Sequence, residues 1–145
     1  MTTTATEGLL PALVPLLREA TTAAQGFIAD VTVDLRAQYA GPTGFDRQRA
    51  DQDQHVIHGF GWFAAYSEAM NQVADWADRL SQEGAFGEVE ALLAQLLFAE
   101  YTAQFVAGIP MNQSEFIRPT DLTKNTATLA RLEAPALIKL SREGA

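Results

Sequence analysis

The sequence contains no cysteine, and this absence excludes several kinds of chemistry. Disulfides, thiolate nucleophiles, thiolate zinc sites and iron–sulfur clusters all require cysteine sulfur. Basic residues are also scarce, because 10 lysines and arginines accompany 18 acidic residues and leave a formal net charge of −8. Nucleic-acid binding depends on a basic surface. The charge therefore argues against nucleic acid as a partner, and against anionic membrane surfaces as well.

Long uninterrupted apolar runs are missing too. No run approaches the roughly 18 residues that a membrane-spanning helix needs. The N-terminus, MTTTATEG, lacks the basic start and apolar core of a signal peptide. We therefore expect a cytoplasmic protein without a membrane partner. Glycine motifs that bind phosphate, GxGxxG and GxxxxGK[ST], are absent from the sequence.

What the sequence does have is apolar residues at three- and four-residue steps, which is the spacing of α-helices. We expect three long helices, over residues 11–39, 46–82 and 87–107. Asp46 suits the N-cap of the second helix. Gly84 is placed to end that helix in a left-handed conformation.

Two shorter helices should follow, one over residues 120–132 and one after Pro135. No segment alternates convincingly enough to predict a strand. The sequence therefore predicts an all-α fold, a mainly antiparallel bundle of three long helices plus one or two short C-terminal helices. The bundle forms a single domain over residues 9–145, preceded by a disordered tail at residues 1–8.

The stretch from His55 to Leu80 is central to this prediction. It is apolar on several sides, which is typical of a helix buried among others. Its aromatic residues are expected in the core rather than around a ligand slot: Trp62, Phe63, Tyr66 and Trp76. A row of small residues at i, i+4 and i+8 should let a neighbouring backbone come close: Gly61, Ala65 and Ala69.

Three polar residues interrupt the apolar helices and are predicted to be buried: Glu100, His58 and Glu68. A buried carboxylate such as Glu100 must be paired or have a raised pKa, which makes it a candidate catalytic acid. Pairing with a base or a backbone donor is the favoured interpretation. His55 and His58 share one helical face, so a metal or acid–base role is conceivable. The Glu-x-x-His pair of di-metal bundles is missing, however, which favours a structural role.

The connection from Gly108 to Pro119 is long and irregular, with proline near each end. Residues 1–117 carry 15 acids and 5 bases, a net charge of −10, whereas residues 118–145 carry 3 acids and 5 bases, a net charge of +2. The basic tail should lie against the body or against an acidic partner. Apolar residues of the connection need cover: Met111, Phe116 and Ile117. We take these positions as a candidate interaction loop: Gly108, Ile109, Pro110, Met111, Gln113, Glu115 and Arg118.

Two blocks, HGFGWFAAYSEAM at residues 58–70 and AEYTAQFVAGIPMNQSEFIRP at residues 99–119, carry a family resemblance. Together they resemble the N-terminal helical extension of (2S)-methylsuccinyl-CoA dehydrogenases, which belong to the acyl-CoA dehydrogenase superfamily. The resemblance extends from about Leu9 to about Leu122. The matching positions are His58, Gly59, Trp62, Tyr66, Glu68, Glu100, Tyr101, Gly108, Ile109, Pro110, Met111, Gln113, Glu115, Arg118 and Pro119.

The resemblance implies a role but no active site. That family oxidises a methyl-branched acyl-CoA thioester with FAD, passes electrons to an electron-transfer flavoprotein, and acts in the ethylmalonyl-CoA pathway. Its FAD-binding elements and catalytic base lie downstream of the extension, so no catalytic, cofactor-binding or metal residue is assigned here. Glu100 and Glu115 match the extension, not the base.

The implied function is that of a non-catalytic helical domain or subunit in docking or oligomer assembly. Its implied partner is an acyl-CoA dehydrogenase-type catalytic domain or subunit, or further copies of this chain. Two alternatives stay open: a small-molecule bundle that binds acyl or CoA groups in an aromatic slot beside Glu100, and a metal-dependent enzyme that uses His55, His58 and Glu100.

Overall fold

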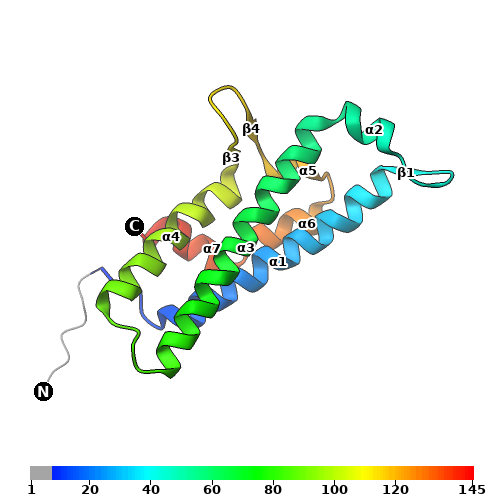
Figure 1. Cartoon of the computed structure of the whole chain (residues 1–145). Helices are drawn as coiled ribbons and strands as arrows, with labels where there is room; N and C mark the ends of the chain where they lie inside the picture. Colours follow the sequence, from blue (N-terminus) through cyan, green and yellow to red (C-terminus); the bar gives the residue numbers. More distant parts are fainter. Residues whose placement is uncertain (1–7) are drawn as a thin grey trace, which may run out of the picture.

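The computed structural model describes residues 8–145, and three long helices dominate it (Figure 1). They are α1 (Leu13–Gln38), α3 (Gln54–Gln82) and α4 (Glu88–Ala107). The shorter elements are α2 (Arg47–Gln52), α5 (Pro119–Leu122), α6 (Thr126–Ala130), the 3-10 turn η1 (Arg131–Glu133) and α7 (Pro135–Glu143). The predicted all-α class is confirmed, with three short C-terminal helices in place of one or two.

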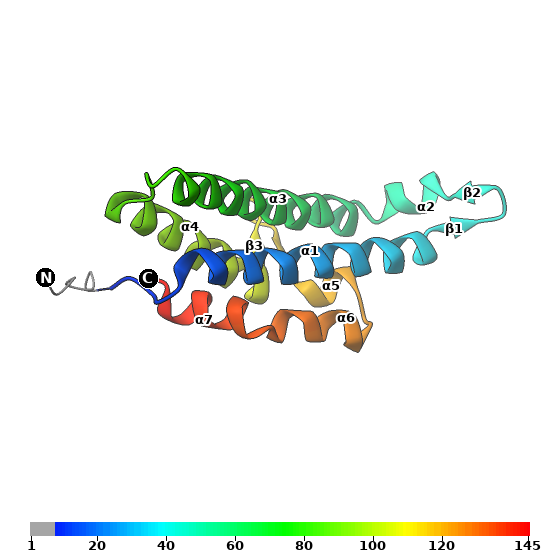
Figure 2. The same ribbon diagram turned by 90° about the horizontal axis from the view of Figure 1, so that it is seen from below.

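The helices form two layers. Figure 1 shows α1 and α3 running antiparallel side by side, with α4 returning beside α3. Figure 2 shows the C-terminal helices α6 and α7 lying along α1, on the side away from α3. Helix α7 packs against both α4 and α1. One layer is therefore α3 with α4, and the other is α1 with the C-terminal helices.

The predicted second helix is two helices in the structure. The break falls at Asp53, whose carboxylate accepts a hydrogen bond from the Tyr39 hydroxyl at 3.1 Å. Burial, and then the bond to Asp53, raises the pKa of Tyr39 to about 12. The N-cap prediction is confirmed, because the Asp46 side chain accepts from the Arg49 backbone N–H. Gly84 has a φ of 71°, as predicted for the end of α3.

The first long helix starts at Leu13, two residues later than predicted. Pro15 lies in its first turn, where an amide N–H would have no helical partner. Ala12 precedes the helix in a left-handed conformation, with a φ of 52°. Pro11 is therefore a turn residue and not the first residue of the helix.

Two short antiparallel strand pairs depart from the all-helical prediction. They are β1 (Ala40–Gly41) with β2 (Gly44–Phe45), and β3 (Ile109–Pro110) with β4 (Phe116–Ile117). Each pair closes a hairpin that projects from the bundle (Figure 1). The first joins α1 to α2, and the second occupies the predicted interaction loop.

The predicted helix over residues 120–132 is broken into α5, α6 and η1. Asn125 caps the start of α6, because its side chain accepts a hydrogen bond from the Ala127 N–H at 3.0 Å. Asp34 of α1 accepts hydrogen bonds from the Thr123 hydroxyl at 2.6 Å and the Thr128 hydroxyl at 3.0 Å. These bonds hold the connection between α5 and α6 against α1. An ion pair between Arg131 and Asp30 adds to them. The basic tail thus lies against the body of the protein, which was one of the two predicted arrangements.

The centre of the core is a cluster of three fully buried rings, Phe27, Phe63 and Phe105. Their centroids are 5.9, 5.6 and 5.1 Å apart in the three pairings, and two of the three contacts are edge-to-face. Edge-to-face contacts of this kind add stability beyond burial of the ring area. One ring comes from each of α1, α3 and α4, so the cluster joins the three long helices.

Gln95 is a buried polar residue whose side chain forms hydrogen bonds with residues near both ends of the described chain. It is 3% exposed. Its side chain accepts from the Leu10 N–H at 2.8 Å and donates to the Gly8 carbonyl at 2.8 Å and the Gly144 carbonyl at 3.0 Å. The disordered tail predicted for residues 1–8 lies outside the described residues except for Gly8.

Candidate interaction surface

The hairpin that contains β3 and β4 is built against α3. Met111 N–H donates to the Glu115 carbonyl at 2.9 Å, and the Asn112 side chain accepts from the Glu115 N–H at 3.0 Å, which closes the turn. A Cβ atom at Gly59 of α3 would lie 2.4 Å from the Ile117 side chain. The hairpin can therefore sit this close to α3 only because residue 59 is glycine.

This geometry divides the predicted interaction loop into an inner and an outer half. Gly108, Ile109 and Met111 are buried against the bundle, so these three members of the candidate interaction loop are not exposed for an external contact. The outer half is exposed: Pro110, Gln113, Glu115 and Arg118. Met111 and Ile117 were expected to need cover, and the bundle itself provides it. Phe116, 41% exposed, is the apolar residue of the hairpin that remains uncovered.

Arg118 is the charged residue at the base of the hairpin. Its guanidinium lies 4.8 Å from the centre of the Phe116 ring, a cation–π arrangement. Among residues 8–145, no carboxylate lies within ion-pair distance of this side chain. Arginine and an aromatic ring are the residue types enriched in protein–protein contacts. The pair therefore has the residue types that are common in protein–protein contacts.

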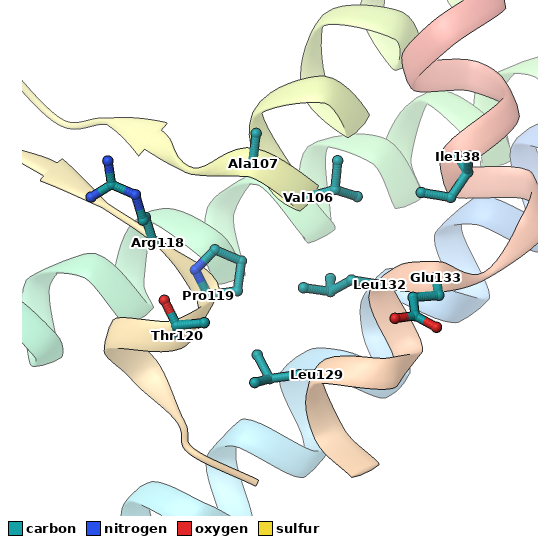
Figure 3. Close-up of a pocket in the computed structure, with 9 residues that line it drawn as sticks. All are labelled: Val106, Ala107, Arg118, Pro119, Thr120, Leu129, Leu132, Glu133 and Ile138. Atoms are coloured by element: carbon teal, nitrogen blue, oxygen red, sulfur yellow. The ribbon is translucent and has the colours of Figure 1, made fainter. Parts of the chain in front are cut away.

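A groove of about 410 Å³ lies beside Arg118. Figure 3 shows Arg118 at one edge and Glu133 at the opposite edge, with apolar side chains between them. The lining residues come from α4, α5, α6, η1 and α7: Val106, Ala107, Arg118, Pro119, Thr120, Leu129, Leu132, Glu133 and Ile138. The groove is thus formed where the C-terminal tail meets the end of α4.

The three polar residues predicted to be buried are exposed, and that prediction was wrong. Glu100 lies on the outside of α4, Glu68 accepts a hydrogen bond from Gln72 at 2.6 Å, and His58 accepts one from the Trp62 indole at 3.2 Å. Exposed carboxylates need no partner, so the argument for a catalytic acid at Glu100 no longer holds. Among residues 8–145, no group of three histidine, aspartate or glutamate side chains is placed to hold a metal ion.

The four aromatic residues of α3 that were expected in the core differ in how deeply they are buried. Phe63 is fully buried, as predicted. Trp62, Tyr66 and Trp76 are half-buried along the seam between α3 and α4. The Tyr66 ring stacks on the Tyr101 ring with centroids 4.4 Å apart. Burial, and then Tyr101 and Glu100, raises the pKa of Tyr66, so its hydroxyl stays protonated and donates to Gln104 at 2.6 Å.

Beyond this seam, α3 and α4 present an apolar surface that sequence reasoning missed. We call it the outer face, and it comprises Gly61, Trp62, Ala65 and Ala69 of α3 with Val89, Leu93, Leu96 and Glu100 of α4. Val89, Leu93 and Leu96 are 63%, 59% and 50% exposed, so one side of α4 faces solvent although the helix is rich in apolar residues. The predicted close approach at Gly61 is wrong within this chain, because nothing lies within 4 Å of a Cβ built there.

The features described so far define a helical bundle with exposed apolar residues on its surface. No helix among residues 8–145 is long and apolar enough to cross a membrane. No protein-family model matches the sequence. A curated relative does match it: (2S)-methylsuccinyl-CoA dehydrogenase of Cereibacter sphaeroides is 46% identical over 72 residues.

That alignment relates half of this chain to a segment of the dehydrogenase. It covers only 13% of the dehydrogenase's own length. The family resemblance noted in the sequence is therefore confirmed over 72 residues, a shorter stretch than the one from Leu9 to Leu122 that we had inferred.

Proposed function

We propose that this chain is a non-catalytic helical domain or subunit of an acyl-CoA dehydrogenase-type flavoenzyme, with a role in docking or oligomer assembly. The observation that carries the proposal is the 46% identity over 72 residues to a segment of methylsuccinyl-CoA dehydrogenase. Identity at that level over half a chain indicates common ancestry. The FAD and the acyl-CoA chemistry then belong to the catalytic partner.

The outer half of the β3–β4 hairpin is the proposed contact with that partner. Phe116 supplies exposed aromatic area and Arg118 supplies a cation that no described carboxylate pairs with. Contacts of this type concentrate binding free energy in a few aromatic and arginine side chains. The buried side of the hairpin, Ile109 and Ile117, fixes it to the bundle so that little order is lost on binding.

Co-purification with the flavoprotein tests the proposal. The tagged chain is expressed together with the catalytic region of a methylsuccinyl-CoA dehydrogenase, and the eluate is examined for flavin absorbance and stoichiometry. We expect flavin to elute with the chain. Arg118→Ala should weaken the association at least tenfold without changing the helical circular dichroism signal, whereas Arg36→Ala, an exposed arginine of α1, should not weaken it. Absence of flavin from the eluate contradicts the proposal.

The groove beside Arg118 favours a second candidate function, binding of an acyl-CoA. Its apolar walls suit an acyl chain, and arginine pairs well with phosphate or carboxylate groups. Calorimetric titration of the isolated chain with butyryl-CoA tests this function. Binding that Arg118→Ala weakens and Arg36→Ala does not would support it, and a titration without heat would rule it out for that ligand.

A further inference from the structure

We propose that an apolar pocket between α1, β2 and α3 binds a small monocarboxylate with an apolar body, of the size of an aryl carboxylate. The proposal goes beyond the docking role put forward above and does not depend on it. The pocket lies where α1 leads into the β1–β2 hairpin (Figure 2). Its volume is about 210 Å³, and seven residues line it: Thr32, Leu35, Arg36, Tyr39, Phe45, Ile57 and Phe60.

The walls of the pocket come from three elements whose apolar side chains meet at this point. Four lining residues follow one face of the chain at the end of α1, at i, i+3, i+4 and i+7, and two lie at i and i+3 on α3. Phe45 of β2 adds a further wall, because its ring meets the Tyr39 ring edge-to-face with centroids 6.0 Å apart. Leu35 and Tyr39 are buried, whereas Phe45 is 57% exposed. The pocket therefore has buried residues at its base and an exposed aromatic ring at its edge.

The size of the pocket limits the ligand to a small molecule. An apolar cavity of about 150 Å³ is sufficient for benzene. Pockets that hold drug-sized ligands are larger, at about 300–1,000 Å³. A pocket of about 210 Å³ therefore fits one ring, or an alkyl chain of similar bulk, with a few further atoms. It is too small to enclose a flavin or a whole acyl-CoA.

The lining suits an apolar body. Nearly all of the surface that the pocket exposes is apolar. Polar atoms of the lining already have partners, because the Thr32 hydroxyl donates to the Ile28 carbonyl at 2.7 Å and the Tyr39 hydroxyl donates to Asp53 at 3.1 Å. Three of the seven lining residues are aromatic, and aromatic rings pack well against a ring of the ligand in edge-to-face or offset arrangements.

Arg36 is the charged residue of the lining, and it determines the head group. Its side chain is exposed, and among residues 8–145 no carboxylate lies within ion-pair distance of it. A guanidinium binds a carboxylate through two parallel hydrogen bonds. The ring of the ligand would fill the pocket while its carboxylate meets Arg36 at the edge.

The charge around the pocket allows an anion to approach an otherwise acidic chain. Residues 32–67 include the whole lining and carry three bases and four acids, a net charge of −1, whereas the rest of the chain carries a net charge of −7. None of the four acids lines the pocket. Three of them already accept hydrogen bonds within the fold: Asp34, Asp46 and Asp53. An anionic ligand is therefore repelled less here than over the rest of the surface.

Titration of the chain with phenylacetate, followed in amide NMR spectra, tests the proposal. We expect saturable shifts in the residues that line the pocket, with a dissociation constant of about 1 mM or tighter. Phenethylamine and 2-phenylethanol have the same ring with a cationic and a neutral head group, and should bind about fivefold more weakly or worse. Acetate has the charge without the ring and should cause no saturable shift.

Arg36→Ala and Arg47→Ala are a matched pair of variants, because both arginines are exposed and Arg47 begins α2 outside this pocket. Arg36→Ala should weaken phenylacetate binding about fivefold or more and abolish the preference for phenylacetate over 2-phenylethanol. Arg47→Ala should keep both the affinity and the preference. Phe45→Ala removes an exposed wall and should weaken phenylacetate and 2-phenylethanol alike. Circular dichroism establishes that each variant still folds.

The proposal is overturned by titrations without saturable shifts, by shifts confined to another part of the chain, or by equal affinity for the three phenyl ligands. If phenylacetate does not bind and Phe45→Ala abolishes co-purification with the flavoprotein, the pocket holds a side chain of a protein partner instead. A chain that binds phenylacetate at this pocket but retains no flavoprotein would refute the docking proposal alone, so the two proposals fail separately.

Discussion

The two layers of this bundle hold their neighbours by different means. The side formed by α1 and the C-terminal helices is held by polar contacts between residues far apart in sequence. Asp34 of α1 binds Thr123 and Thr128, and Gln95 of the neighbouring α4 binds the segments before α1 and after α7. These bonds place a tail of short helices that have little intrinsic stability.

The outer face of α3 and α4 has no such contacts. Its polar interactions are short in range, as in the bond from Trp62 to His58, and its ridge of Val89, Leu93 and Leu96 touches solvent. Directional polar contacts are thus concentrated where the chain packs on itself. Apolar area is left open where only another molecule can cover it. A large exposed apolar area of this kind generally marks an interaction site.

The largest expected effect comes from replacing two adjacent aromatic residues of α3 with alanine, one in the core and one toward the outer face. Phe63 is fully buried between Phe27 and Phe105, whereas Trp62 is half-buried toward the outer face. Phe63→Ala should lower the free energy of unfolding by roughly 3–5 kcal/mol because it opens a cavity in the core. Trp62→Ala should cost only ~1–2 kcal/mol, since part of its area is already exposed.

Urea unfolding followed by circular dichroism measures both costs. The comparison must be made at a protein concentration where the chain is monomeric, since self-association adds to apparent stability. Equal costs for the two truncations would mean that the outer face is packed like the core, and the contrast between the layers would disappear.

The next largest effect on stability is expected from removing the hydrogen bonds of Gln95. Gln95→Leu keeps the approximate shape but leaves the Leu10 N–H and the Gly144 carbonyl without their partner. Buried groups left unsatisfied cost roughly 1–3 kcal/mol. Gln104 is half-buried and accepts a hydrogen bond from the Tyr66 hydroxyl. Gln104→Leu should therefore lower the free energy of unfolding by less than Gln95→Leu does. Hydrogen exchange should also rise in residues 8–12 and 140–145 of Gln95→Leu alone.

The sequence was sufficient for the helices because their signal is local. Apolar spacing, the Asp46 cap and the Gly84 turn all lie within a few residues of the structure they determine. The division of the 120–132 segment had a local signal that was overlooked, because Asn125 is the N-cap of α6. The position of this segment against α1 could not be read locally, because it depends on Asp34, which lies 89 residues before Thr123.

The polar residues of α4 were misjudged for a physical reason. The helix is apolar on nearly every side, so its sequence does not indicate which face points to the core. Glu100 was assigned to the interior and is exposed, while Gln95 is the residue that is buried. The small residues Ala91 and Ala94 and the aromatic Phe98 lie on the buried face, and Gln95 falls among them at helical spacing. This spacing was the one feature of the sequence that could have indicated that Gln95 is buried.

The hairpin was missed because two-residue strands leave no alternating pattern. Ile109 and Ile117 pair across a turn, and Ile117 packs against Gly59 of α3, which lies far earlier in the chain. A loop sequence does not reveal which of its residues a distant helix will cover. The inner residues of the candidate interaction loop are therefore buried, and the contact role of its outer residues stays a prediction.

The smallest effect is the pH dependence of the stability that Asp34 contributes. The hydrogen bond from Thr123, and then those from Thr128 and Asn125, lower the pKa of Asp34 below its ordinary value of about 3.9. A carboxylate with a lowered pKa stabilises the folded state above its unfolded pKa, and this stabilisation is lost as the pH falls through the folded pKa. Asp34→Asn should cost about 1–2 kcal/mol near neutral pH, because an amide is a weaker acceptor than a carboxylate.

Unfolding measured between neutral pH and strong acid should show the cost of Asp34→Asn shrinking as the pH falls, since the wild-type carboxylate is then protonated too. Asp51→Asn, an exposed position on α2, is the matched control and should show no such dependence. A pH-independent cost would mean that the fixed position of the tail depends on apolar packing of α7 and not on the charge of Asp34.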